Sequence, residues 1–123
     1  DSSSPKNHFI PSGWMGDYGD MKYDGASKED PYLGNSCIKI IYSGKATQGA
    51  RWAGIYWQHP ANNWGTVDAG FDLSRATKLT FWARGAKGGE VLQKVMVGGI
   101  KGTYPDTTLV EMGTIELNDT WKQ

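Results

Sequence analysis

The densest group of residues that could bind a ligand lies in residues 51–65, which hold three of the six tryptophans together with amide side chains. Successive side chains of a strand point to opposite sides, so a strand over residues 51–58 would gather aromatic rings and one amide on a single face. The proline that follows would break this strand into a loop with two further amides and another tryptophan. In chain order, the candidate ligand-binding residues are Trp52, Tyr56, Gln58, Asn62, Asn63 and Trp64.

Flat rings beside planar hydrogen-bonding groups suit a sugar, because a pyranose offers one apolar face for stacking and a ring of hydroxyl groups for hydrogen bonds. Gly54 lies between two of the rings on the same predicted face and would leave room for a ligand. Trp82 and Arg84 belong to an alternating stretch further along the chain, and we expect them beside this site on an outward face. The alternative for any one tryptophan is burial between two sheets, since aromatic residues dominate core packing.

Three aspartates in a glycine-rich stretch form a candidate metal site. Asp17, Asp20 and Asp24 lie close together in sequence among three glycines. Calcium prefers hard oxygen ligands from carboxylates and backbone carbonyls on a folded loop, so we expect these residues to bind a structural calcium ion. Their spacing differs from that of an EF-hand, and the alternative is a solvated loop in which the aspartates cap turns.

The remaining inventory does not support catalysis. The two histidines, His8 and His59, belong to no local signature of a Ser-His-Asp arrangement, and Cys37 is the single cysteine. Lys and Arg number 13, as do Asp and Glu, so the formal net charge is +0 and favours neither nucleic acid nor an anionic membrane as a partner. We therefore expect a binding or structural protein and no enzyme.

Composition predicts an all-β fold. Seventeen glycines and five prolines punctuate short apolar stretches, and long runs of helix formers are absent. We expect residues 1–8 to form a flexible or extended N-terminal arm and residues 9–123 a single β-sandwich domain. Strands are expected over residues 37–42, 51–58, 77–84, 90–100 and 114–117, with a structured loop over 14–25 and a hairpin turn over 85–89. The core is expected to contain Ile38, Ile40, Ile55, Leu79, Phe81, Val95 and Val97.

Four stretches resemble the galactose-binding-like β-jelly-roll modules that serve as carbohydrate-binding domains of bacterial and archaeal extracellular proteins. They are residues 31–42, residues 52–63, residues 70–74 before 79–85, and residues 115–117 continuing to Trp121-Lys122. The resemblance implies a jelly-roll β-sandwich, an extracellular location, one structural calcium ion and non-catalytic binding of a glycan or polysaccharide. It lies in strand order and loop style more than in a diagnostic motif.

The chain departs from this family at its end. A pattern like Trp121-Lys122 opens a strand in such modules, whereas this chain stops at Gln123, which predicts a jelly roll without its last strands. Truncation would explain this, and so would a strand supplied by an identical subunit. The second explanation defines the alternative function, a structural subunit of an extracellular filament, tube or surface layer. Residues 1–10 would then be the donated strand, because donor-strand complementation adds an extended segment to an open sheet edge.

Overall fold

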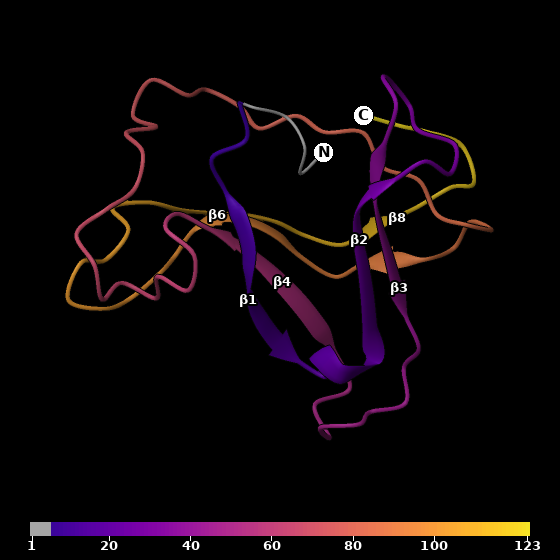
Figure 1. The fold of residues 1–123 in the computed structure, drawn as a ribbon, viewed down its shortest axis with the longest axis horizontal. Coiled ribbons are helices and arrows are strands. Elements are labelled where there is room, and N and C mark those ends of the chain that lie inside the picture. Colours follow the sequence, from indigo (N-terminus) through magenta and orange to yellow (C-terminus); the bar gives the residue numbers. More distant parts are fainter. Residues whose placement is uncertain (1–5) are drawn as a thin grey trace. The chain divides into compact units, whose positions relative to one another are not determined.

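The computed structural model describes residues 6–123, whose regular structure is almost entirely β (Figure 1). The elements are β1 (Ile10–Gly16), the 3₁₀ turn η1 (Tyr18–Asp20), β2 (Met21–Ser27), β3 (Cys37–Tyr42), β4 (Ala53–Gln58), β5 (Val91–Leu92), β6 (Val95–Gly98), β7 (Leu109–Met112) and β8 (Ile115–Glu116). The all-β prediction is confirmed. Within the described residues every sheet is a pair of strands, so the jelly-roll arrangement stays a prediction.

The chain divides into two compact units, one ending at Asn63 and the other beginning at Trp64. In the first unit β1 pairs with β4, and β2 pairs with β3, both antiparallel (Figure 1). Each pair forms a two-stranded ribbon. Trp14 lies opposite Ile55, and Tyr23 lies opposite Ile40. The Trp14 and Tyr23 rings meet edge to face at 5.7 Å, so the two ribbons contact each other through these aromatic side chains.

The predicted loop over residues 14–25 is wrong, because this stretch contains most of β1, the turn η1 and the first part of β2. Its glycines and aspartates occupy the junction between the strands. Gly16 ends β1 with a φ of +64°, a left-handed conformation that favours glycine, and the Trp52 ring lies close to its Cα. Long-range pairing with β4 and β3 makes strands of residues whose local pattern favours turns.

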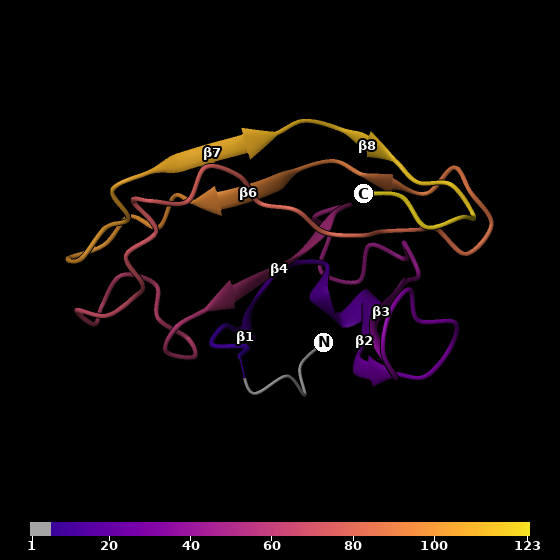
Figure 2. The same cartoon turned by 90° about the horizontal axis from the view of Figure 1, so that it is seen from above.

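In the second unit β6 pairs with β7 and β5 with β8; Figure 2 shows β6 and β7 side by side. The expected strand over 77–84 is wrong: only Ala83 forms a β-bridge, and its partner is Lys122. The expected hairpin over 85–89 does not pair its own arms either. Backbone bonds from Gly85 to Asn118 and from Gly89 to Leu117 join this segment to the end of the chain.

The predicted core is wrong for three of its seven residues. Ile38, Ile40 and Leu79 are exposed, and the other four predicted core residues are only partly buried. No hydrophobic side chain between Lys6 and Gln123 falls in the buried class, whereas the side chains of Asp17, Asp20, Ser27, Gln58 and Asn63 do. Polar contacts therefore define the best-buried positions of the described chain. The residues from Lys6 onward also include no helix long and apolar enough to cross a membrane.

Residues 1–5 of the expected arm lie outside the described residues. Further along, the His8 carbonyl contacts the His59 ring nitrogen Nδ1 at 2.9 Å, and Ile10 already pairs with Gln58 in β1. The second half of the expected donor strand therefore contacts its own chain. The expected single domain over residues 9–123 stays a prediction.

Candidate functional site

An exposed aromatic ring directly before β4 lies close to glycine backbone. Trp52 is 45% exposed, and its ring lies over Gly16 and Gly54, where no side chain separates it from the backbone. A Cβ atom at Gly54 would lie 3.2 Å from Met15 Cε and 3.4 Å from Trp52 Cζ3. The space above Gly54 is thus filled by these two side chains and is not open to a ligand. By strand alternation, Tyr56 lies on the same face of β4.

The amide of Gln58 holds a loop in place. Gln58 is 2% exposed; its Oε1 accepts a hydrogen bond of 2.8 Å from the Ser12 hydroxyl, and its Nε2 donates to the Asn63 carbonyl at 2.9 Å. The Ser12 hydroxyl also accepts the Asn62 backbone N–H at 2.9 Å. Asn63 is itself 7% exposed. Of the three predicted ligand-binding amides, only the exposed Asn62 side chain is accessible.

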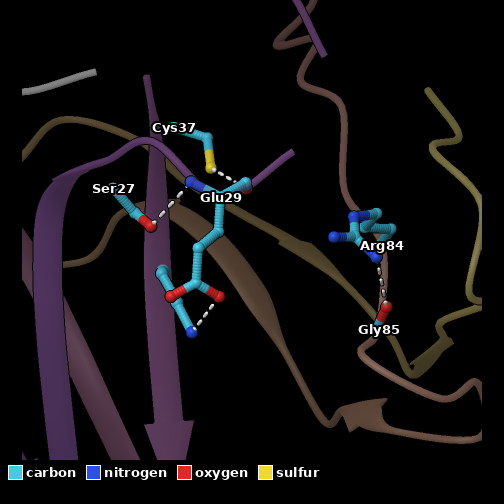
Figure 3. Close-up of polar contacts among 6 residues, drawn as sticks. Ser27, Glu29, Cys37, Arg84 and Gly85 are labelled. Carbon is cyan, nitrogen blue, oxygen red and sulfur yellow. Dashed lines mark hydrogen bonds and ion pairs between the residues drawn. The ribbon is translucent and has the colours of Figure 1, made fainter. Parts of the chain in front are cut away.

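The other predicted site residues belong to the second unit. Trp64 is 42% exposed beside a turn in which Gly65 accepts the Tyr104 N–H, and Trp82 is 40% exposed. The Arg84 guanidinium lies 5.5 Å from the centre of the Trp121 ring and donates to the Gly85 carbonyl at 3.4 Å (Figure 3). Arg84 therefore has a partner for stacking and one for hydrogen bonding within its own unit.

Asp17 is completely buried and surrounded by backbone donors. Its carboxylate accepts N–H groups from Gln48 at 2.8 Å, Ala50 at 3.0 Å and Arg51 at 2.5 Å. A carboxylate that accepts several N–H bonds needs no cation to compensate its burial. Asp17 thereby fixes the segment that leads into Trp52, whose carbonyl accepts the Asp17 N–H at 2.7 Å.

Asp20 and Asp24 also bind protein groups. The Asp20 carboxylate accepts the Thr47 hydroxyl, and this bond is the main cause that lowers the pKa of Asp20 from its ordinary value of 3.8 against the opposing effect of burial. Its stabilising contribution is present above pH 3.8 and is lost as the pH falls through the lowered pKa. Asp24 accepts the Ala26 N–H at 2.9 Å. From Lys6 onward, no three His, Cys, Asp or Glu residues gather in a metal-binding cluster, and calcium stays a prediction.

Sequence reasoning missed Ser12 and the lysines of β2 and the following loops. Ser12 lies at the register shift between Pro11 and Gly13, where β1 has one residue more than β4. A polar residue between proline and glycine signals a turn, and only the pairing with β4 turns its hydroxyl toward Gln58. Charged Lys22 lies between apolar Met21 and aromatic Tyr23. This two-residue period in polarity could have indicated a strand despite the nearby glycines.

No protein-family model matches the chain, and comparisons with curated proteins and with solved structures found no match.

Proposed function

We propose that this protein is a non-catalytic, extracellular carbohydrate-binding module and that the exposed Trp52 ring is its main sugar-stacking surface. The observation that carries the proposal is a ring that is 45% exposed to solvent and lies close to the backbone of Gly16 and Gly54. Such a ring loses little conformational freedom when a sugar stacks on it, because it is already held in one orientation. The resemblance of residues 31–42 and 52–63 to galactose-binding-like modules supports the same function.

The other site residues divide into contact residues and positioning residues. Tyr56 shares the face of Trp52, and the exposed Asn62 amide would hydrogen-bond sugar hydroxyls at one end of that face. Gln58 and Asn63 are buried and would act on a ligand only by holding the loop that carries Asn62. Trp64, Trp82 and Arg84 are the remaining candidate contact residues, and they belong to the second unit.

The replacement Trp52→Ala is expected to weaken binding of a neutral polysaccharide by about tenfold or more, because central aromatic anchors dominate small interfaces. The measurement is a glycan array to find the ligand, followed by titration calorimetry of wild type and variant. Asn62→Gly is a second variant, since glycine tolerates the Asn62 φ of +60° and the exchange removes only the amide side chain. It should weaken binding without lowering the melting temperature.

Tyr104→Ala is the control, because Tyr104 is also a large aromatic residue, 47% exposed, and is not one of the candidate ligand-binding residues. It should leave binding at the Trp52 face unchanged. Unchanged affinity of a folded Trp52→Ala protein would contradict the proposal. So would an array without any bound glycan.

A second candidate function, a structural subunit of an extracellular filament or layer, is favoured by the surface of β3. This strand pairs only with β2 among the described residues, so its other edge has unpaired backbone groups. Four of its six residues are large, apolar or aromatic, and exposed: Ile38, Ile40, Ile41 and Tyr42. An exposed apolar edge strand is a template for a strand from an identical subunit, and one-directional addition of subunits gives a polymer.

In this second function, light scattering and electron microscopy should detect concentration-dependent polymers, with calcium and with a chelator compared in parallel. Ile40→Lys should abolish them, because a charge on an edge strand opposes strand addition. Lys39→Gln is a control on the same strand. A stable monomer at all concentrations in both solutions would rule this function out.

A further inference from the structure

The face of the β2–β3 ribbon that bears Lys22 contains two adjoining hollows. The larger has a volume of about 360 Å³ and is lined by Gly19, Asp20, Lys22, Ile41, Ser43, Lys45 and Thr47. The smaller, about 170 Å³, is lined by Lys22, Tyr23, Asp24, Glu29, Lys39 and Ile41. They share Lys22 and Ile41, which are partners in the strand register. The larger hollow falls within the range of about 300–1,000 Å³ typical of ligand pockets.

This face lies apart from the Trp52 surface. Tyr23 contacts the Trp14 ring and so points toward the β1–β4 ribbon. Side chains alternate along a strand, so Lys22 points to the opposite side. The groove formed by the two hollows follows the ribbon from Lys39 to Ser43, four steps of about 3.3 Å or roughly 13 Å in all. It is therefore longer than a single small ion requires.

The charges in the larger hollow favour an anion. Neither Lys22 nor Lys45 forms an ion pair within the described residues, whereas Lys39, which lines the smaller hollow, pairs with Glu29 at 2.5 Å. Asp20 also lines the hollow, but it is 6% exposed and its carboxylate is bonded to Thr47. Lys22 and Lys45 thus line the larger hollow beside one carboxylate that already has a hydrogen-bond partner. In the smaller hollow, Glu29 is paired with Lys39 and the Asp24 carboxylate accepts the Ala26 N–H.

We infer that this groove binds a segment of an acidic polysaccharide, with carboxylate or sulfate groups on the sugar units held by Lys22 and Lys45. The half-exposed Ile41 side chain gives an apolar contact for a sugar face between the two charges, and the Ser43 hydroxyl gives a hydrogen-bonding partner. A nucleic acid fits less well, because the whole chain has a formal net charge of +0. This inference needs neither Trp52 nor binding of a neutral glycan.

The test is titration of the full chain with oligogalacturonate, dextran sulfate, neutral dextran, inorganic sulfate and single-stranded DNA. Either charged saccharide should bind, and the stronger of the two identifies carboxylate or sulfate as the recognised group. Lys22→Gln and Lys45→Gln should each weaken binding about threefold to fivefold, the effect of losing an exposed ion pair. Affinity should fall as salt is raised from 50 to about 150 mM.

Lys78→Gln and Lys101→Gln are matched controls, since both lysines are exposed residues of the second unit and line neither hollow. They should leave binding unchanged. Equal loss in groove and control variants would overturn the site, as would tighter binding of DNA or of free sulfate than of the acidic saccharides. Trp52→Ala should retain acidic-saccharide binding, so failure of the neutral-glycan proposal and failure of this one are distinguishable.

Discussion

Asp17→Ala should destabilise the first unit by about 3–5 kcal/mol. The change removes three hydrogen bonds to a charged acceptor. The N–H groups of Gln48, Ala50 and Arg51 then lose the carboxylate that accepts them. A hydrogen bond to a charged group contributes about 1.5–3 kcal/mol to stability. Water that enters the space left by the carboxylate would bond to the N–H groups and recover part of the lost stability. Chemical denaturation followed by tryptophan fluorescence would measure the change.

Asp24→Ala is the control for this experiment, because Asp24 is exposed and its carboxylate accepts one local N–H from Ala26. It should cost less than about 1 kcal/mol. Equal stability of the two variants would contradict the role assigned to Asp17. The same denaturation with excess chelator tests calcium: backbone donors alone predict an unchanged midpoint, whereas a calcium ion at these aspartates predicts a lower one.

Gln58→Ala should destabilise the first unit by about 2–3 kcal/mol. The amide is 2% exposed and joins Ser12 of β1 to the Asn63 carbonyl, so its loss opens a buried space and breaks two hydrogen bonds. The Asn62 side chain would then lose its fixed position, and neutral-glycan affinity should fall along with stability. Denaturation midpoint and calorimetric affinity, measured on the same preparation, would test both consequences.

Gln48→Ala is the matched glutamine control, because that side chain is exposed and only its Oε1 accepts the Gly19 N–H at 3.2 Å. It should change stability by less than about 1 kcal/mol. Ser12→Ala should have an intermediate effect, since it removes the hydroxyl between Gln58 and Asn62 but leaves the Gln58–Asn63 bond intact. A Gln58→Ala protein as stable as wild type would show that the loop is held by other contacts.

The local pattern correctly predicted two strands of the first unit. The strand over 37–42 is β3, and the strand over 51–58 contains β4 with its start two residues later. The cleanest alternation, over 77–84, failed. Alternation requires only that two faces differ, whereas a strand also needs a partner for its backbone groups, and in this stretch only Ala83 finds one, at Lys122.

Residue type predicted the members of the candidate site, and the burial of each side chain showed which of them a ligand can reach. Trp52 is exposed as expected, whereas Gln58 and Asn63 were expected to contact a ligand and are buried. Nothing local distinguishes a buried amide from an exposed one. The difference arises because Ser12, 46 positions earlier in the chain, supplies a partner for Gln58.

The sequence by itself determined the all-β class, because glycine and proline at short intervals prevent long helices, and it determined which side chains could stack on or hydrogen-bond a sugar. Tertiary structure alone decided which of them remain accessible. It also decided that Asp17 accepts backbone donors from residues 48–51 and that Lys22 and Lys45 line one hollow. Such contacts join residues some 20 to 35 positions apart, and their geometry depends on strand register, which no local pattern specifies.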